Sequence, residues 1–392
     1  MNIILFDDHL ADQLLPFTYT RPVAELRVGI LTMKEKWEQY LLNSASCLSY
    51  ATRDYLQAKF PLNSSHDNFY INAALFANKE LLNAIQILET GQGLMYNDRI
   101  IAVRSDNFDI NNHASVEFTS YEGNADFLSF PWEIFSKNDR EIKADFTLLT
   151  NGKKSQPLSN TNQVIGAEHV FVEQGAKVEC AVINASTGPV YIAKNAEVME
   201  GSLIRGPFAL GENAVLKMGA KIYGATTIGP GCKVGGEVSN SVFIANSNKA
   251  HDGFVGNSVI GEWCNLGADT NTSNLKNNYS NVKVWSYKEQ SMIDTGLLFC
   301  GLMMGDHSKC SINTMFNTGT VVGVSANIFG AGFPDKFVPS YTWGATGDSE
   351  RFLLDKAIAL AKTVMQRRGI EMSAADEKIL SEVYLKDLHL SA

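Results

Sequence analysis

The sequence predicts an α/β N-terminal region, a left-handed parallel β-helix built of hexapeptide repeats, and a C-terminal helical tail. The main observation is an aliphatic residue at every sixth position through the middle of the chain. These residues are Ile192, Val198, Ile204, Leu210, Leu216, Ile222, Ile228 and Val234. Neither a helix of period 3.6 nor a strand of period 2 produces this spacing. A hexapeptide repeat does, because six residues form one short strand and one corner of a solenoid.

The residues between the aliphatic positions support the same fold. Four positions after each aliphatic stands a mostly small residue, as a narrow close-packed core requires: Ala196, Ser202, Phe208, Ala214, Ala220, Thr226 and Cys232, with Phe208 the exception. Three positions after it stand corner residues, several of which tolerate a positive φ: Asn195, Gly201, Pro207, Asn213, Gly219, Ala225 and Gly231.

The repeat continues on both sides with changes of register. Before the block stand Val172 and Val178; after it, two further series follow: Val242, Phe254, Ile260 and Leu266, then Leu298, Met304, Cys310, Phe316, Val322 and Ile328. We interpret each register change as an insertion, and insertions in a solenoid become loops on one face, often the binding face. The sequence therefore directs the search for chemistry to residues 240–297.

The whole chain divides into four predicted regions: an α/β domain over 1–150, a linker over 151–163, the β-helix over 164–345 and C-terminal helices over 346–392. In the first region we expect strands at 2–6, 47–50 and 69–75, helices at 30–42, 54–60 and 79–88, and a hairpin at 93–104 turning at Asn97-Asp98. Alternating strands and helices favour a mostly parallel sheet. A linker helix is expected near 131–135. Ser349 and Ser373, the latter with Asp376, are expected to begin the two C-terminal helices.

Composition excludes several functions. A net charge of −9 and a pI near 5.4 argue against a nucleic-acid partner. No stretch is long and apolar enough to span a membrane. The six scattered cysteines form no C-x-x-C, which predicts reduced thiols and a cytoplasmic protein without a signal peptide. The histidines lack the paired spacing of zinc ligands, which argues against a zinc enzyme, so no metal site is predicted there.

The N-terminal region holds one weak candidate site. The first strand is followed by LLPFTYTRP and then by Arg27-Val28-Gly29. Ligands bind at the carboxyl edge of open α/β sheets, so Arg21 and Arg27 could hold phosphates bidentately. An ordinary surface loop with Arg21 paired to Glu25 is the alternative. Asp7 and Asp8 are candidate metal ligands, or simply solvated carboxylates.

Between the register changes stand Asn246–Gly256, Asn265–Thr270 and Ser273–Asn277, which are dense in polar residues. Histidine is the side chain that ordinarily changes its charge near neutral pH, so His251 can act as a general base there. The stretch from Arg205 to Lys288 carries eight basic and five acidic residues, which suits an anionic ligand or merely a solvated surface. In the structural alternative, Asp252 pairs with Lys249 and His251 has no catalytic role.

The residues Lys249-Ala250-His251-Asp252-Gly253-Phe254, Ile260-Gly261, Asn265-Leu266-Gly267-Ala268 and Asn274 resemble a known motif. It belongs to the acetyltransferase half of the bifunctional bacterial enzymes that make UDP-N-acetylglucosamine. Those enzymes join an N-acetylglucosamine-1-phosphate uridylyltransferase to a left-handed β-helix glucosamine-1-phosphate acetyltransferase. The whole chain resembles a divergent branch of that family, described as sugar-phosphate nucleotidyltransferases.

The resemblance assigns roles to individual residues. It implies His251 as the catalytic base, Asn265 and Asn274 as sugar ligands, Arg205 as a phosphate ligand, and Gly267 and Ala268 beside acetyl-CoA. Phe254 stands where the family has a substrate-contacting Tyr, and Leu275 and Ser239 also depart from its pattern. Lys249 or Lys276 is expected to compensate for the neutral Ser239 by holding the sugar phosphate.

The N-terminal resemblance is partial. Sugar-phosphate nucleotidyltransferases carry a Gly-rich G-x-G-T-R loop after the first strand, whereas here no glycine occurs before Gly29. Pro16-Phe17-Thr18 and Arg21-Pro22 are similar to the later part of that motif. The region is also short for a complete uridylyltransferase, so nucleotidyl transfer, with Mg²⁺ as its metal, stays an open second activity.

The expected function is acetyl-CoA-dependent N-acetylation of an amino-sugar 1-phosphate, similar to glucosamine 1-phosphate, in nucleotide-sugar and cell-envelope precursor synthesis. By resemblance the protein is a homotrimer, without a nucleic-acid or membrane partner. Two alternatives remain: a sugar-1-phosphate uridylyl- or thymidylyltransferase that uses the β-helix as a scaffold, and a catalytically silent assembly or regulatory protein.

Overall fold

A computed structural model describes residues 2–41, 47–344 and 349–390. They form two compact units. Unit 1 comprises Met1–Leu14, Thr18–Leu26 and Leu31–Phe130, and unit 2 comprises Leu15–Phe17, Arg27–Ile30 and Pro131–Ala392. The four predicted regions, with boundaries at 150, 163 and 345, stay a prediction. Within the described ranges, no helix has the length and apolarity that crossing a membrane requires.

Unit 1 is built on one six-stranded sheet with the order β2-β1-β3-β5-β4-β6. Its strands are β1 (Asn2–Phe6), β2 (Cys47–Ala51), β3 (Asn68–Asn72), β4 (Gln92–Tyr96), β5 (Arg99–Ser105) and β6 (Glu117–Ser120). Its helices are α1 (Met33–Leu41), α2 (Lys79–Gln86) and the short 3-10 helices η1 (Ala11–Leu14), η3 (Val23–Glu25) and η4 (Asp54–Leu56). Parallel β1–β2, β1–β3 and β4–β6 pairs outnumber two antiparallel ones, so the α/β expectation is confirmed.

The hairpin of unit 1 forms as predicted, and two other details differ. Asn97 and Asp98 both have positive φ in the turn between β4 and β5, as a two-residue hairpin turn requires. The helix expected over 54–60 is reduced to η4. Strand β6 was not predicted, because its residues are largely exposed and polar and show no apolar alternation.

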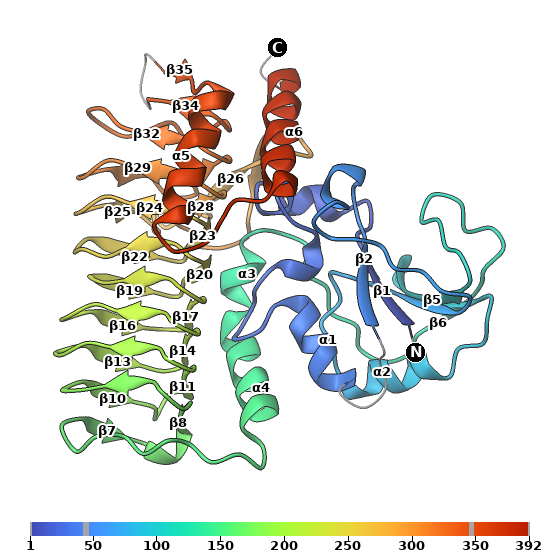
Figure 1. Cartoon of the computed structure of the whole chain (residues 1–392), viewed down its shortest axis with the longest axis horizontal. Helices are drawn as coiled ribbons and strands as arrows, with labels where there is room; N and C mark the ends of the chain where they lie inside the picture. Colours follow the sequence, from blue (N-terminus) through green and yellow to red (C-terminus); the bar gives the residue numbers. More distant parts are fainter. Residues whose placement is uncertain (1, 42–46, 345–348, 391–392) are drawn as a thin grey trace. The chain divides into compact units, whose positions relative to one another are not determined.

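Unit 2 is a three-sided parallel β-helix (Figure 1), which confirms the predicted fold class. The first sheet contains β7 (Gln163–Ile165), β10 (Val182–Asn184), β13 (Leu203–Arg205), β16 (Lys221–Tyr223), β19 (Glu237–Ser239) and β22 (Phe254–Gly256). The second contains β8 (Val170–Val172), β11 (Val190–Ile192), β14 (Phe208–Leu210), β17 (Thr226–Ile228), β20 (Val242–Ala245), β23 (Val259–Glu262), β28 (Met303–Met304), β31 (Val321–Val322) and β33 (Phe337–Val338). The third contains β9 (Lys177–Val178), β12 (Glu197–Val198), β15 (Val215–Leu216), β18 (Lys233–Val234), β21 (Asn248–Lys249), β24 (Asn265–Leu266), β29 (Lys309–Cys310), β32 (Asn327–Ile328), β34 (Thr342–Trp343) and β35 (Glu350–Arg351).

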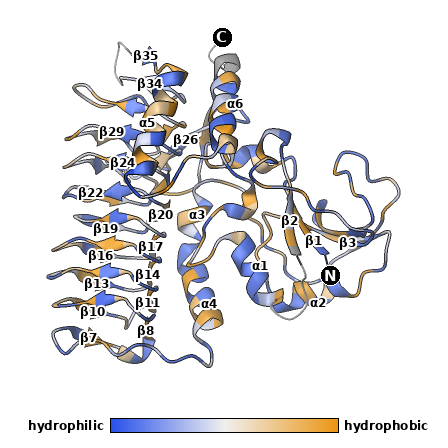
Figure 2. Ribbon diagram, in the orientation of Figure 1, coloured by the Kyte–Doolittle hydropathy of each residue, from blue (hydrophilic) through white to orange (hydrophobic). Residues whose placement is uncertain are grey.

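The six-residue pattern explains this architecture. Val190 pairs with Phe208 and Phe208 with Thr226, so one turn takes three hexapeptides. The aliphatic positions from Ile192 to Val234 all belong to one buried core. Phe208, the large residue at an otherwise small position, is also fully buried. Orange and blue segments alternate along the coils in Figure 2, as expected where inward aliphatic residues are followed by polar corners.

The corners also follow the sequence. Asn195, Gly201, Asn213, Gly219 and Gly231 all adopt positive φ, as expected of corner residues. At two other predicted corners the geometry differs. Gly224, rather than Ala225, adopts the positive φ, and Pro207 follows a cis peptide bond.

The register change after Val234 differs from its interpretation as an insertion. Val234 pairs with Lys249 and Thr227 with Val242, so these coils are shortened and carry no insertion. The inward residues of this part are Phe243 and Val255, while Val242 and Phe254 lie one position away from the core column. Sequence spacing alone could not distinguish a deletion from an insertion, because both change the phase of the repeat.

The register change after Leu266 is an insertion, as predicted. Val259 pairs with Met303, and the extra residues include β25 (Asn271–Thr272) and the antiparallel hairpin of β26 (Lys283–Ser286) and β27 (Ser291–Asp294). Strand β25 pairs with β30 (Met315–Phe316). Leu298, expected in the core column, is 44% exposed because it lies in the inserted loop.

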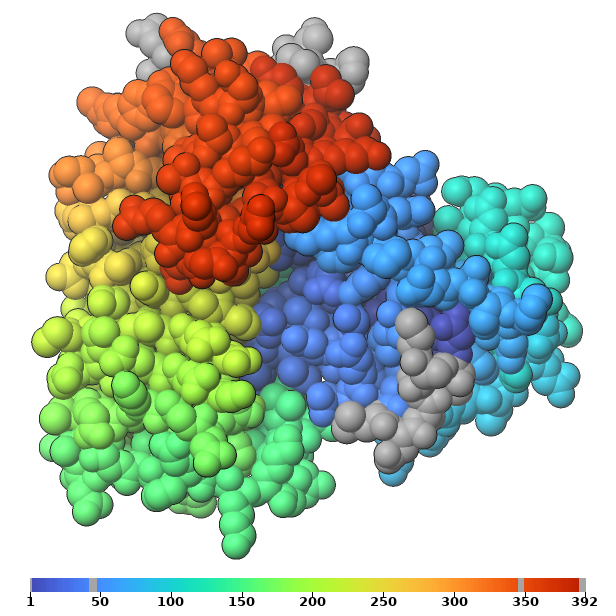
Figure 3. Space-filling view, viewed as in Figure 1, coloured from blue at the N-terminus to red at the C-terminus, as the bar shows by residue number. Residues whose placement is uncertain are grey.

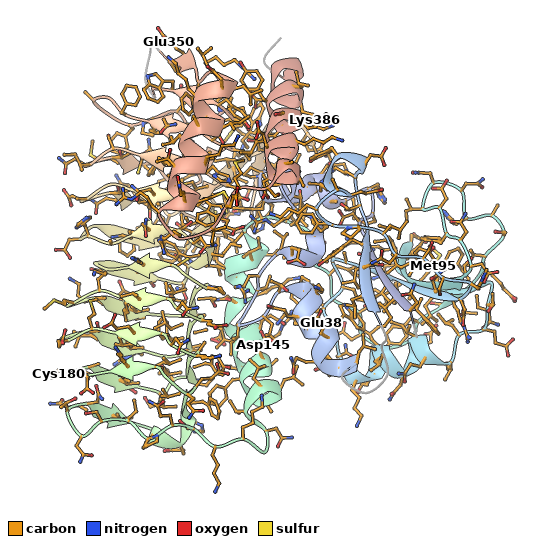
Figure 4. All side chains as sticks on the ribbon, in the orientation of Figure 1. Glu38, Met95, Asp145, Cys180, Glu350 and Lys386 are labelled. Carbon is orange, nitrogen blue, oxygen red and sulfur yellow. The ribbon has the colours of Figure 1, made fainter. Side chains whose placement is uncertain are left out.

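Helices cover two of the three sheets. The short α3 (Glu133–Ser136) lies in the predicted linker helix, but α4 (Asn138–Thr150) was not predicted. Asn138 of α4 donates through Nδ2 to the Ala225 carbonyl, and Thr227 of β17 donates through Oγ1 to Asn138 Oδ1. Asp145 of α4, labelled in Figure 4, accepts the Ile30 amide. These hydrogen bonds hold α4 against the outer face of the second sheet.

The tail forms α5 (Leu354–Gln366) and α6 (Ala374–Leu390), which confirms the predicted C-terminal helices. Ser373 caps α6 together with Asp376, as predicted. Ser349 does not cap α5, because β35 intervenes and the helix begins at Leu354. In Figures 1 and 3, α5, in red, lies over the yellow and orange coils of the same unit.

Candidate functional site

His251 lies at the corner where β21 of the third sheet ends and before β22 of the first sheet begins. Its side chain is exposed and lines a cavity of about 680 Å³ within unit 2. The shortening of this coil shapes the corner, because Glu237 to Phe254 spans fewer residues than a regular turn. The cavity therefore opens where the regular solenoid is interrupted.

The cavity lies between the coils of the β-helix and α5. Residues of the third sheet and its corners form one wall: Lys233, Asn246, Asn248, Ala250, His251, Trp263, Cys264, Asn265, Leu266, Gly267, Ala268, Lys309 and Ile312. Leu360, Val364, Arg367 and Arg368 form the other. Four predicted site residues, His251, Asn265, Gly267 and Ala268, thus lie in one cavity.

A chain of hydrogen bonds connects α5 with the predicted sugar ligand Asn265. The Arg368 guanidinium donates to the Gly231 carbonyl and to Asn248 Oδ1, both at 2.7 Å. Asn248 Nδ2 in turn donates to Asn265 Oδ1 at 3.4 Å. The amide orientation of Asn265 is therefore coupled to the C-terminal end of α5.

Lys249 occupies an unexpected place. It pairs with Val234 and belongs to the column of inward residues, where its side chain is only 1% exposed. Its ammonium donates to the carbonyls of Gly235 and His251, at 3.1 and 2.7 Å. Burial lowers the pKa of Lys249 to about 8, opposed by the charges of Asp252 and Asp269. The ammonium thus holds the backbone of the His251 corner and does not line the cavity.

The backbone around Gly267 offers one candidate oxyanion donor. The Gly267 N–H donates to the Cys310 carbonyl at 3.1 Å and is therefore occupied by the solenoid ladder. A Cβ at Gly267 would lie 2.4 Å from Ser311 backbone atoms, so the glycine permits close approach of the next coil. The N–H of Ala268, which also lines the cavity, is the remaining candidate for stabilising a developing oxyanion.

Phe254 of the first sheet lies beside Asn274, which follows β25 in the inserted segment. A Cβ added to Gly256 would meet Phe254 Cζ at 2.5 Å and Asn274 Nδ2 at 2.7 Å, so both side chains lie over this glycine. The Asn274 amide donates to Asn257 Oδ1, and the Phe254 N–H to Asn271 Oδ1. The structure thus brings together two residues that were predicted to contact the sugar substrate. They lie on the other side of the His251 corner from the cavity.

The other predicted cations lie elsewhere. Arg205 is exposed on the first sheet, three strands before Gly256, which at ~4.8 Å per strand is about 14 Å away. Tyr223 stands between them and donates from its hydroxyl to Glu237. Lys276 donates to the Asn281 carbonyl within the inserted loop.

The two N-terminal candidates, Arg21 and Arg27, are both buried. Arg21 is 6% exposed in unit 1, whereas Arg27 belongs to unit 2, where its guanidinium donates to the Ile30 carbonyl. Neither therefore presents an exposed cation to a phosphate in this conformation.

Asp7 and Asp8 are engaged within unit 1. Asp7 accepts from the Val23 amide and the Thr52 hydroxyl, and burial raises its pKa to about 6. Asp8 accepts from the Leu10 amide, from Asn72 and, at 2.7 Å, from the Arg99 guanidinium. Among the described residues no group of three or more His, Cys, Asp or Glu could hold a metal ion.

Sequence reasoning missed the basic residues of the cavity. Lys233, Lys309, Arg367 and Arg368 line it, and among the described residues of its lining there is no Asp or Glu. Two of them follow directly after α5, far along the chain from His251. The one available signal was the pair of arginines before Gly369, which the spacing of the repeat could not connect to the site.

Comparisons with known proteins agree with the resemblance. Residues 3–154 match the family model described as sugar nucleotidyl transferase. The chain is 35% identical over 107 residues to "Bifunctional protein GlmU" of Methanocaldococcus jannaschii, covering 27% of this chain and 26% of that protein. It is 28% identical over 269 residues to the "Bifunctional sugar-1-phosphate nucleotidylyltransferase/acetyltransferase" of Sulfurisphaera tokodaii, covering 66% of this chain and 57% of that one.

Over parts of its length the chain is therefore similar to a sugar nucleotidyl transferase model and to proteins named GlmU or bifunctional nucleotidylyltransferase/acetyltransferase. The chain spans only about a quarter to somewhat over half of the length of the two curated relatives named. Among solved structures, a UDP-N-acetylglucosamine acyltransferase of Francisella novicida matches 60% of this chain and 86% of its own. Its sequence identity is 14% and its TM-score 0.27, too low to carry an argument about function.

Proposed function

We propose that the chain is an acetyl-CoA-dependent N-acetyltransferase acting on an amino-sugar 1-phosphate similar to glucosamine 1-phosphate. The observation that carries the proposal is the single cavity lined by His251, Asn265, Gly267 and Ala268. The resemblance of the sequence to the acetyltransferase motif implies a role in the reaction for each of these four residues. The names of the relatives favour the same class of reaction.

In the proposed reaction the amine attacks the thioester carbonyl, forming an N–C bond, and the C–S bond breaks. A neutral His251 imidazole removes the amine proton and returns it to the departing thiolate. The Ala268 N–H stabilises the oxyanion of the tetrahedral intermediate. General base catalysis of this kind contributes typically 10²–10⁴-fold.

The acceptor is proposed to bind on the first-sheet side of His251, against Phe254 and Asn274. Phe254 supplies an apolar ring and no hydroxyl, so contacts with the sugar rest on its face and on the Asn274 amide. The acyl donor and the sugar acceptor would then bind on two sides of one corner, with His251 between them. A general base needs this position because it must reach both the amine proton and the departing thiolate.

We also propose that the protein is a cytoplasmic homotrimer. The outer face of the first sheet exposes apolar side chains: Ile165 is 55% exposed, Leu203 48% and Tyr223 40%. An exposed apolar sheet face favours association with further copies. Free thiols at the five described cysteines fit a reducing compartment. Sedimentation equilibrium tests the trimer.

The test of the main proposal is thiol release from acetyl-CoA with glucosamine 1-phosphate, for the wild type beside His251→Ala. We expect acceptor-dependent release that falls at least about a hundredfold in the variant. Asp252→Asn is a matched control, because this neighbouring side chain is also exposed but does not line the cavity. Equal rates in wild type and His251→Ala would refute the role of His251.

A second candidate function is nucleotidyl transfer by unit 1, favoured by the family model over residues 3–154. Pyrophosphate release from UTP or dTTP with sugar 1-phosphates and Mg²⁺ tests it. His251→Ala should not affect that activity, because His251 belongs to unit 2. Tight sugar-phosphate binding without turnover in either assay would instead favour the assembly or regulatory alternative.

A further inference from the structure

The cations assigned to the substrate phosphate from sequence are not in the cavity. Lys249 is buried in the solenoid column, Lys276 is engaged in the inserted loop, and Arg205 lies about 14 Å from the Phe254 strand. A reaction on a sugar phosphate with a coenzyme A thioester nevertheless brings several phosphate groups to the site. Their charge requires another set of donors.

The end of α5 provides such a set. Arg367 and Arg368 line the cavity from the helix side, and Lys233 lines it from the third sheet. Arg368 is held in place by the Gly231 carbonyl and Asn248 Oδ1, so its guanidinium is already oriented. Preorganised guanidinium groups bind phosphates bidentately and lose little freedom in doing so.

The charge of this set is not neutralised by the cavity. In the part of the chain that the structure describes, no carboxylate lines the cavity, and Glu262, which accepts from Asn246 Nδ2, lies outside the lining. The nearby charge of Arg368, with burial and Lys217 as smaller causes, lowers the pKa of Lys233. Positive groups that repel one another across a cavity create a positive potential, which an anion relieves.

We propose that Arg367, Arg368 and Lys233 form a phosphate-binding subsite beside His251, for a phosphate group carried by one of the two substrates. The inference rests on the proposed function in one respect, that a phosphate-bearing substrate reacts at His251. The phosphate belongs either to the coenzyme A donor or to the sugar acceptor, and the two sources share the same chemistry.

The first arm of the test measures binding without turnover. Inorganic pyrophosphate, coenzyme A and glucosamine 1-phosphate are titrated calorimetrically against wild type, Arg367→Met, Lys233→Met and Lys356→Met. Lys356 is an exposed cation on α5 that does not line the cavity and serves as the matched control. Arg367 and Lys233 are exposed, so their variants should fold even where a change at Arg368 would loosen α5.

We expect Arg367→Met and Lys233→Met each to weaken pyrophosphate binding about tenfold, the usual contribution of a charge-assisted hydrogen bond, and Lys356→Met to leave it unchanged. Equal binding by all four proteins would overturn the subsite. This arm stays informative if the acetyltransferase assay fails, because it measures no chemistry.

The second arm identifies the source of the phosphate. If the donor is the source, Arg367→Met raises KM for acetyl-CoA about tenfold and leaves KM for acetyl-pantetheine unchanged. If the acceptor is the source, it raises KM for glucosamine 1-phosphate and leaves that for glucosamine unchanged. Equal effects on the phosphate-bearing and phosphate-free member of both pairs would overturn the proposal.

Discussion

Replacing Lys249 by methionine tests the most unusual feature of the solenoid, an ammonium group in its column of inward aliphatic residues. Methionine has similar length and no charge, so it fills the column without a large cavity. The variant removes the two hydrogen bonds that the ammonium donates to the carbonyls of Gly235 and His251. It also removes the cost of burying a cation.

The effect of pH on stability follows from the pKa of Lys249. Burial lowers it from 10.5 in the unfolded chain to about 8 in the folded protein. Between these values the unfolded chain binds more protons, so wild-type stability rises with pH from about 8 to 10.5 and falls as pH is lowered through this window. At ~1.36 kcal/mol per pH unit, the total is about 3 kcal/mol for this 1%-exposed side chain.

The assay is urea unfolding at intervals from pH 7 to 10.5, for wild type and Lys249→Met. Tyrosine and cysteine ionisation affects both proteins, so the difference between their unfolding free energies isolates Lys249. We expect that difference to change by about 3 kcal/mol in favour of the wild type as pH rises. The exposed Lys356→Met should parallel the wild type. Parallel curves for Lys249→Met as well would show that the ammonium is not buried and refute the reasoning.

Two further predictions concern the stability of unit 2. Phe208→Ala should lower the unfolding free energy by about 3–5 kcal/mol, because the ring is fully buried in the column and leaves a cavity; a loss below about 1 kcal/mol in urea unfolding would contradict the packing. Arg351→Ala should destabilise the packing of α6 against β35 by about 2 kcal/mol, since its 3.3 Å partner Asp387 is 1% exposed and would remain a buried charge. Burial already raises the pKa of Asp387, so the loss should shrink in acid as this carboxyl protonates, and Asp387→Asn should cost less than Arg351→Ala.

The solenoid was predictable because its rule is local. An aliphatic residue at every sixth position, a small residue facing it and a corner residue between them describe one coil, and each further coil repeats the rule. The positive φ of Asn195 and Asn213 and the hairpin turn at Asn97-Asp98 also follow from local backbone preferences. The motif around His251 could be recognised because its residues lie close together in the sequence.

Where the six-residue repeat is interrupted, the sequence alone did not predict which residues point into the core of the β-helix. A shortened coil and an insertion shift the phase in the same way, so Val242 and Phe254 were assigned to the column that Phe243 and Val255 occupy. Lys249 was treated as a phosphate ligand, since nothing in its local sequence says that it points inward. Only the register of β18 against β21 shows that it continues the column of Val234.

The sequence alone thus determined the coil, its corners and the residues of the His251 motif, because neighbours in the chain impose them. Tertiary structure decided which cations meet that motif. Arg367 and Arg368 reach the cavity only because the apolar face of α5, with Ala357, Ala361 and Met365 buried, packs the helix in unit 2. Packing of a helix on a sheet depends on the shape of both surfaces, and no spacing in the sequence encodes the distance between residues 251 and 367.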